Sequence, residues 1–183
     1  FSKLKRVLRY IKGTSDLGLF FRKNIDATLC GFVDASFSEE PDSRSRSGYC
    51  FRLGNNTGVF HARSTKQHCI SMSSTEAECL ALYEAVIEMK WLRNVLEDIG
   101  RLQLGQPTTM FEDNQSCIII TKNGKYGKKA KHFDRRIKFN SEVLREGTMA
   151  LVHCPSEIMV ADILTKATTI AKFQELRPLL LGN

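Results

Sequence analysis

Short apolar runs separated by polar turns mark the first third of the chain. Residues 29–33 form one run and end at Asp34, residues 48–53 form a second, and residues 59–62 begin a third. The segment between the second and third runs, residues 54–58, has the glycine- and asparagine-rich composition of a tight turn. Three strands in quick succession, joined by turns, predict an antiparallel meander.

A long helical pattern follows the meander. Ser73 and Glu76 have the spacing of a capping box, in which both side chains satisfy backbone N–H groups at the helix start. Apolar side chains then recur at helical spacing until Gly100 ends the pattern. The apolar positions that we expect to form this helix face are Leu80, Tyr83, Ile87, Trp91 and Val95.

Alternating strand and helix patterns fill the rest of the chain. Early strands followed by β/α alternation predict an α/β fold whose mixed sheet carries helices on both faces. We expect one domain over residues 28–183, with residues 1–27 as an appendage. The other expected elements are a basic helix over residues 1–12, strands over 17–21, 108–112 and 149–154, and helices from residue 114 and over 133–145, 158–166 and 171–181.

Composition and charge narrow the class of protein. Apolar residues make up 42% of the 183 residues, which excludes a disordered chain. No apolar run reaches the roughly 18 residues of a membrane span.

Lysine and arginine number 27 against 20 acidic residues, and the net charge of +7 favours a polyanionic partner such as nucleic acid. The six cysteines include no Cys-x-x-Cys pair, so we expect reduced, buried thiols and no zinc site. The chain begins at Phe1 without a methionine or a secretory signal pattern, which indicates a fragment of a longer polypeptide.

Four carboxylates stand at the edges of predicted elements. Asp34 ends the first strand, Glu76 opens the long helix, Asp113 ends the fourth strand, and Asp162 lies in the helix after the last strand. Strand ends and neighbouring helices of an α/β sheet converge on one crevice. Carboxylates gathered there repel one another and require cations, and two divalent ions can catalyse phosphodiester hydrolysis. Each also has a structural interpretation: Glu76 and Asp113 as cap or turn residues, Asp34 as a strand end, and Asp162 as a surface residue near a helix N-terminus.

Seven short motifs surround these carboxylates. They are GFVDA (31–35), SGY (47–49), KQ (66–67), SSTEAE (73–78), EDNQS (112–116), KHFD (131–134) and ADILTK (161–166). Together and in this order they resemble the ribonuclease H region of Copia-type LTR retrotransposon Pol polyproteins. The opening LKRVLRYIKGT (4–14) resembles the segment that joins reverse transcriptase to that region. The resemblance covers almost the whole chain.

The resemblance implies a ribonuclease H-like fold, in which a five-stranded mixed sheet with its first three strands antiparallel is flanked by helices. It implies an endonuclease that hydrolyses the RNA strand of RNA–DNA hybrids during reverse transcription and leaves 5′-phosphate products. Its catalytic and metal-binding residues carry over to Asp34, Glu76, Asp113 and Asp162, which would hold two Mg²⁺ ions, with Mn²⁺ able to substitute. Glu78 competes with Glu76, and the Thr75-Glu76 pair favours Glu76.

The resemblance also implies contacts and partners. Gln115 is the strongest hybrid-contacting residue, and Asn114, Ser74, Gln67 and Lys66 are weaker ones. The partners implied are an RNA–DNA hybrid and an N-terminally fused reverse transcriptase, in a cytoplasmic virus-like particle, with neither a membrane nor a small-molecule cofactor. The cations that could hold phosphates are Lys66, Arg63, Lys128, Lys129 and Lys131.

The sequence departs from the family at two places. Ser36 and Phe37 stand where the family often has an acidic residue and a tryptophan, and residues 155–158 lack the mobile histidine that many ribonucleases H carry there. We interpret His132 and His153 as structural residues, because a metal-activated water needs no histidine base.

Two other functions stay open. The first is a catalytically silent domain of a decayed or domesticated element, which would bind the hybrid or act structurally. The second is another nuclease or recombinase of the same fold, such as an integrase or a junction resolvase. The motif order around Asp113 and Asp162 disfavours the second.

Overall fold

A five-stranded sheet organises the chain, in the strand order β3-β2-β1-β4-β5. The structure is a computed structural model and describes residues 1–21, 28–38, 42–54, 57–101, 105–125 and 131–182. β1 pairs antiparallel with β2 and parallel with β4, β2 pairs antiparallel with β3, and β4 pairs parallel with β5. The first three strands are therefore an antiparallel meander, as the sequence predicts. The strands are β1 (Leu29–Ser36), β2 (Arg46–Leu53), β3 (His61–Lys66), β4 (Thr108–Glu112) and β5 (Met149–His153).

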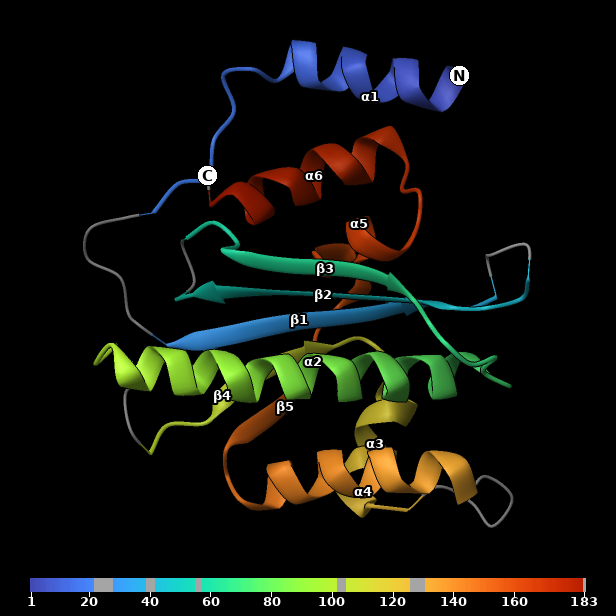
Figure 1. The fold of residues 1–183 in the computed structure, drawn as a ribbon, viewed down its shortest axis with the longest axis vertical. Coiled ribbons are helices and arrows are strands. Elements are labelled where there is room, and N and C mark those ends of the chain that lie inside the picture. The colour runs from blue at the N-terminus through green and yellow to red at the C-terminus, as the bar shows by residue number, and fades with distance from the viewer. Residues whose placement is uncertain (22–27, 39–41, 55–56, 102–104, 126–130, 183) are drawn as a thin grey trace.

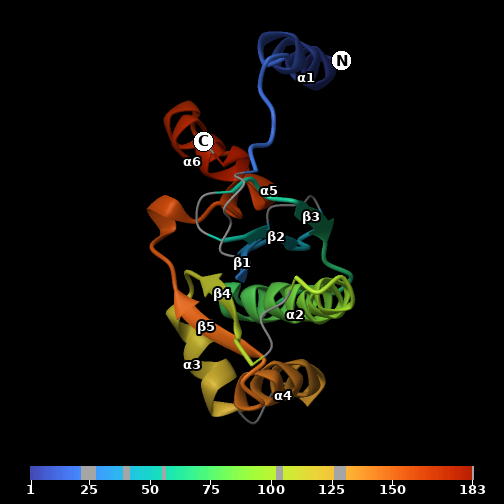
Figure 2. The ribbon, with the colours of Figure 1, turned by 90° about the vertical axis from the view of Figure 1, so that its left-hand side faces the viewer.

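Helices cover both faces of this sheet (Figures 1 and 2). One face packs against α2 (Ser74–Asp98), with α3 (Gln115–Asn123) and α4 (Lys131–Arg145) beyond it. The other face carries the short α5 (Asp162–Thr165) and α6 (Ile170–Leu181), preceded by a 3₁₀ turn at Ser156–Ile158. α1 (Ser2–Gly13) lies outside these layers, beyond α6, and the ring of its Tyr10 contacts the ring of Phe173 in α6 with centroids 5.7 Å apart.

The sheet separates two apolar cores, and β1 contributes to both. Alternate residues of a strand point to opposite faces. Val33 accordingly packs among residues of α2, α3 and α4, whereas Phe32 packs among residues around α5 and α6. All eight residues of β1 are buried, as expected for a central strand covered on both faces. Among the described residues, none of the helices has the combined length and apolar character that crossing a bilayer requires.

Two strand predictions differ from the structure. Residues 17–21 do not form a strand; the backbone of Phe20 instead donates to the Leu181 carbonyl and accepts from Gly58 N–H, both at 2.8 Å. β3 begins at His61 and not at Val59, because Val59 N–H donates to the Leu180 carbonyl at 2.8 Å. In both places the end of α6 takes backbone hydrogen bonds that a strand would otherwise use.

The predicted apolar face of the long helix is only partly the buried one. Leu80 is buried, but Ile87 and Trp91 are 46% and 56% exposed. The face packed on the sheet includes small residues such as Ala85, which allow close approach, together with larger ones such as Met89. A periodic pattern identifies a helix but does not decide which of two neighbouring apolar stripes faces the core.

Gly48 permits the close approach of α5 to the sheet. It pairs with Asp34 across β1 and β2. A Cβ at this position would lie 2.5 Å from Cγ2 of Thr165 and 2.9 Å from Cβ of Leu164. A side chain here would push α5, which carries Asp162 and Thr165, away from β2.

We predict that Gly48→Ala lowers the free energy of unfolding by about 1–3 kcal/mol, because overpacking forces side chains and backbone to shift. Urea denaturation measures the change. Gly13→Ala is the matched control, since no atom lies within 4 Å of a Cβ there. Equal unfolding midpoints for Gly48→Ala and the wild type would contradict the account.

Candidate metal centre

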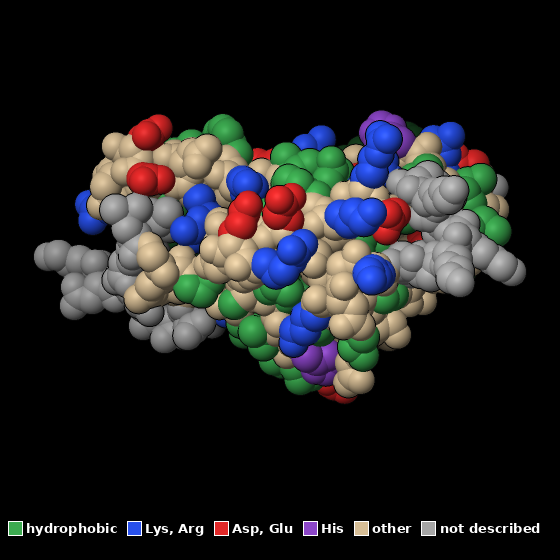
Figure 3. Space-filling model, turned by 90° about the horizontal axis from the view of Figure 1, so that it is seen from below, with side chains coloured by type: hydrophobic (Ala, Val, Ile, Leu, Met, Phe, Trp, Pro, Cys, Tyr) green, Lys and Arg blue, Asp and Glu red, His purple; other side chains and the backbone are tan. Residues whose placement is uncertain are grey.

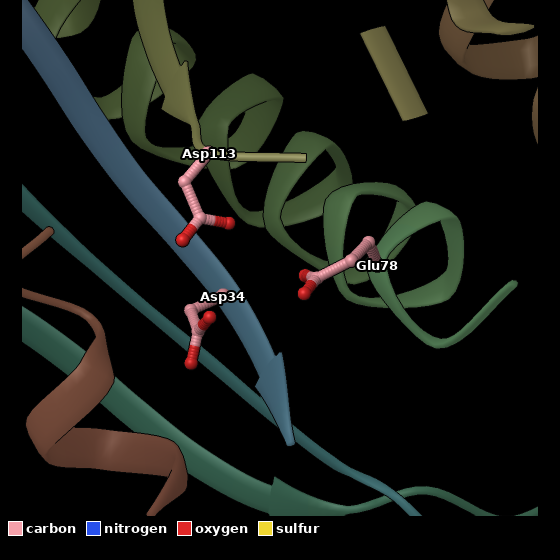
Figure 4. Close-up of side chains that lie close together, drawn as sticks. All are labelled: Asp34, Glu78 and Asp113. Carbon is pink, nitrogen blue, oxygen red and sulfur yellow. The ribbon is translucent and has the colours of Figure 1, made fainter. Parts of the chain in front are cut away.

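Three carboxylates from three different elements meet at one edge of the sheet. Asp34 lies near the end of β1, and Asp113 directly follows β4, the parallel neighbour of β1. Glu78 lies on the second turn of α2. One carboxylate oxygen from each of the three lies within 4.8 Å of the other two, and the side chains point toward one another (Figure 4). Parallel pairing brings both strand ends to the same edge, and α2 packs across it.

Glu76 lies in a different environment from these three. Its backbone N–H donates to Oγ of Ser73 at 3.2 Å, and its Oε2 accepts from Met72 N–H at 2.7 Å. It thus fulfils the helix-capping interpretation of its position. The sequence motif favoured Glu76 as the metal ligand, but the structure groups Glu78 with Asp34 and Asp113. We therefore assign the ligand role to Glu78 as a proposal.

The carboxylates raise one another's proton affinity. Burial raises the pKa of Asp34 to about 6, and the neighbouring carboxylates of Asp162 and Asp113 add to the rise. Burial, followed by Glu112 and Asp34, raises the pKa of Glu78 well above its ordinary value. Oε2 of Glu78 is buried without a hydrogen-bond partner among the described residues. A buried carboxylate oxygen that lacks a donor and lies close to other carboxylates is suited to a divalent cation.

Asp162 adjoins this cluster through α5. Its carboxylate is completely buried, and Lys166 Nζ lies 2.8 Å from Oδ1. The same ammonium lies 3.7 Å from Oδ1 of Asp34, and Oγ1 of Thr165 donates a hydrogen bond to Oδ2 of Asp34. Burial lowers the pKa of Lys166, but Asp162 and Asp34 outweigh burial and raise it, so the ammonium stays charged. Asp34 therefore links the three-carboxylate cluster to Asp162.

Comparison with known proteins identifies relatives of this chain and solved structures with a similar fold. No family model matches the chain. The chain is 33% identical over 172 residues to the retrovirus-related Pol polyprotein from transposon TNT 1-94 of Nicotiana tabacum, and 31% identical over 172 residues to that from transposon RE2 of Arabidopsis thaliana. Each alignment covers 93% of this chain. The chain is homologous to Copia-type retrotransposon Pol polyproteins. It spans 13% and 12% of the length of these two relatives.

Solved structures show the fold of this chain. LC11-RNase H1, isolated from compost by a metagenomic approach, matches with a TM-score of 0.56 at 17% identity, over 76% of this chain and 93% of that chain. The same protein in complex with an RNA/DNA hybrid matches with a TM-score of 0.53 at 17% identity, over 75% of this chain and 94% of that chain. The fold is that of ribonuclease H, which confirms the fold that the sequence motifs implied.

The predicted hybrid-contacting residues of this ribonuclease H-like chain fall into two groups. Gln115 and Ser74 are exposed, each as the first residue of its helix, α3 and α2. Asn114 is partly exposed and caps α3, because its Oδ1 accepts from Cys117 N–H at 2.9 Å. Asn114 and Gln115 directly follow Asp113 along the chain, and Ser74 lies about one turn before Glu78 on α2, so these positions flank the carboxylate cluster.

Gln67 belongs to the second group, because it is completely buried. Its Nε2 donates to Ser47 and to the Ala77 carbonyl, at 3.1 and 2.9 Å, and its Oε1 accepts from Ser71 at 3.0 Å. All of these hydrogen bonds hold the start of α2 against the meander. This placement argues against Gln67 as a hybrid contact.

The basic residues expected to hold phosphates lie in different environments, and some of them are not described by the structure. Lys66 is half-exposed and pairs with Asp42 at 2.7 Å. Arg63 is exposed, and its Nε donates to Oγ1 of Thr65 at 3.1 Å. Lys128 and Lys129 lie outside the described residues, as do the side chains of Lys131 and His132. Seen from the side of α4, basic side chains are scattered among acidic and apolar ones (Figure 3). The excess positive charge is thus not gathered into one patch on this face.

Two residues at the cluster, Ser156 and Glu112, were not singled out by the sequence analysis. Oγ of Ser156 donates to Oδ2 of Asp113 at 2.7 Å, in the stretch where many ribonucleases H carry a histidine. Glu112 is completely buried beside the cluster, and burial raises its pKa well above the ordinary value. His153 is exposed at the end of β5. The signal for Glu78 was available, since Glu76 already satisfies the helix cap and leaves Glu78 as the spare carboxylate.

We predict that the metal-free chain loses stability as the pH rises through about 6. Folded Asp34 keeps its proton to a pKa of about 6, whereas its ordinary value is 3.8. A raised folded-state pKa gives a contribution that is present below the ordinary value and lost as the pH rises through the folded value. The loss from Asp34 alone is up to about 3 kcal/mol.

Thermal or urea unfolding between pH 4 and pH 7.5 in a chelator measures this slope. Asp34→Asn should flatten it, and the exposed Asp98→Asn is the matched control. Identical slopes for the wild type and Asp34→Asn would show that burial and the neighbouring carboxylates do not raise the pKa of Asp34.

Proposed function

We propose that this chain is a metal-dependent ribonuclease H that cuts the RNA strand of RNA–DNA hybrids. The observation that carries the proposal is the convergence of Asp34, Glu78 and Asp113 within 4.8 Å at the edge shared by β1 and β4. Homology to Pol polyproteins and the ribonuclease H fold support it. These residues come from separate parts of the sequence. None of the three caps a helix, as Glu76 does.

Each residue has a defined part in the proposed reaction. Asp34, Glu78 and Asp113 supply the oxygen ligands, with Asp162 completing the set through its position beside Asp34. Two Mg²⁺ ions held there, or Mn²⁺ in their place, would provide an activated water and stabilise the leaving 3′ oxygen. Thr165 and Ser156 orient the carboxylates of Asp34 and Asp113 by the hydrogen bonds that they donate. The buried Glu112 directly precedes Asp113 and, after burial, is the main neighbour that raises the pKa of Glu78.

The substrate proposal rests on the edge next to the cluster. Gln115 and Ser74 are exposed there, and hydrogen-bonding side chains in a wide minor groove can read 2′-hydroxyls. The net charge of +7 favours the sugar-phosphate backbone of either strand. The complex of LC11-RNase H1 with an RNA/DNA hybrid shows that this fold accommodates such a duplex in that protein.

The relatives support a proposal for the polypeptide context of this chain. They are Pol polyproteins many times longer than this chain, and residues 4–14 resemble the segment that follows reverse transcriptase. We propose that residues 1–27 connect the ribonuclease H domain to an N-terminally fused reverse transcriptase. The position of α1 outside the layers of the domain supports this division.

We predict that Glu78→Gln lowers the rate of hybrid cleavage on the order of 100-fold or more, because it removes a charged metal ligand. Glu76→Gln is the matched control: the amide oxygen can still accept from Met72 N–H, so the rate should stay close to wild type. The measurement is cleavage of a hybrid labelled on the RNA strand in Mg²⁺, with Asp113→Asn and a chelator as blanks.

Three results would change the proposal. If Glu76→Gln abolished cleavage and Glu78→Gln did not, the ligand role would return to Glu76. Hybrid binding without cleavage by the wild type would favour the catalytically silent domain. Cleavage of four-way junctions or duplex DNA in preference to the hybrid would favour a recombinase-type nuclease of the same fold.

A further inference from the structure

Two lysines neutralise the charge of Asp162, the carboxylate beside the cluster of Asp34, Glu78 and Asp113. Asp162 has one ammonium at each carboxylate oxygen: Lys166 at Oδ1, 2.8 Å away, and Lys172 at Oδ2. The Asp162 side chain is completely buried, whereas those of Lys166 and Lys172 are 35% and 29% exposed. The two lysines come from different places, since Lys166 directly follows α5 and Lys172 lies in the first turn of α6.

This arrangement divides the site into two unlike halves. Glu78 and Asp113 have no ion pair with any lysine or arginine among the described residues, whereas Asp162 has two. Asp34 lies between the halves, 3.7 Å from Lys166 and within reach of both other carboxylates of the cluster. A divalent ion can therefore enter the Asp34–Glu78–Asp113 half without displacing an ammonium from Glu78 or Asp113. An ion that bridged Asp34 and Asp162 would have to replace ammonium at Asp162.

An ammonium and a divalent ion cannot share the same carboxylate oxygen without strong repulsion in a buried site. Lys172 is the more readily displaced of the two lysines. Among the described residues its ammonium pairs with Asp162 alone, and it belongs to α6, a helix separate from α5. Lys166, by contrast, is held by both Asp162 and Asp34.

We infer that Lys172 is a built-in competitor for the second metal position. It neutralises Asp162 when the second divalent ion is absent and lowers the affinity of that position until it withdraws toward solvent. The first position, formed by Asp34, Glu78 and Asp113, fills independently of Lys172. Lys172 acts through Asp162 and does not contact the reacting atoms. The inference rests on the proposed metal-dependent function.

The test is a titration of the full chain with Mn²⁺ in the absence of nucleic acid, with free Mn²⁺ followed by electron paramagnetic resonance. Lys172→Met should lower the dissociation constant of the weaker of two binding events by about tenfold or more, because it removes a competing charge next to Asp162. The stronger event should change little. Lys172→Arg keeps the cation and should bind as the wild type does.

Lys138→Met is the matched control. It also deletes a lysine–aspartate ion pair on a helix, the pair with Asp134 in α4, far from Asp162 in the fold. Circular dichroism melts show whether each variant is folded. If Lys172→Met does not fold, the inference is tested by Lys172→Arg alone, which keeps the test decisive. A weaker binding event that tightens in Lys172→Arg, although a cation stays beside Asp162, would then overturn the inference.

The outcomes separate this inference from the nuclease proposal. Unchanged binding in Lys172→Met, with hybrid cleavage intact in the wild type, overturns the inference and leaves the nuclease proposal standing. Tighter second-ion binding in Lys172→Met, without cleavage by the wild type, supports the inference and overturns the nuclease proposal. Absence of any Mn²⁺ binding by all variants overturns both.

Discussion

The parallel pairing of β1 with β4 is the constraint on which the site depends. It places Asp34 and Asp113 at the same edge of the sheet, although 79 positions separate them in a chain whose first three strands are antiparallel. The packing of α2 on the same sheet then brings Glu78 to that edge. Gly48 serves the same arrangement from the opposite face, because it lets α5 approach β2 with Thr165 and Asp162 in reach of Asp34.

Convergence of these groups has an electrostatic cost that the fold meets in two ways. On the side of Asp162, lysines provide positive charge within the chain. On the side of Glu78 and Glu112, burial and mutual repulsion raise the pKa values, so protons offset the charge until a cation arrives. Carboxylates kept together against repulsion are a strained arrangement that stability alone would not favour. The proposed metal-dependent function gives a reason to keep such a site, and the fold of a ribonuclease H is consistent with a metal as the cation.

Much of this arrangement could be predicted from the sequence, and the exceptions have physical causes. The meander and the αβ alternation follow from apolar periodicity, and Asp34 and Asp113 from their places at strand ends. The Thr75-Glu76 pair favours Glu76 over Glu78, and only packing shows that Glu78 is the carboxylate that lies with Asp34 and Asp113. The sequence predicts Gln67 as a hybrid-contacting residue, but its side chain makes buried hydrogen bonds that no local pattern reveals. Lys172 could not be connected with Asp162, because their contact depends on the path of the chain between α5 and α6.

Crystals of the chain grown with Mn²⁺ and a non-cleavable RNA–DNA hybrid would test the central claim most directly, through anomalous scattering from the metal. The account predicts an anomalous peak at coordination distance from Asp34, Glu78 and Asp113, with Glu76 still bonded to the backbone of Met72. A peak ligated by Glu76, or no peak between β1 and β4, would contradict it.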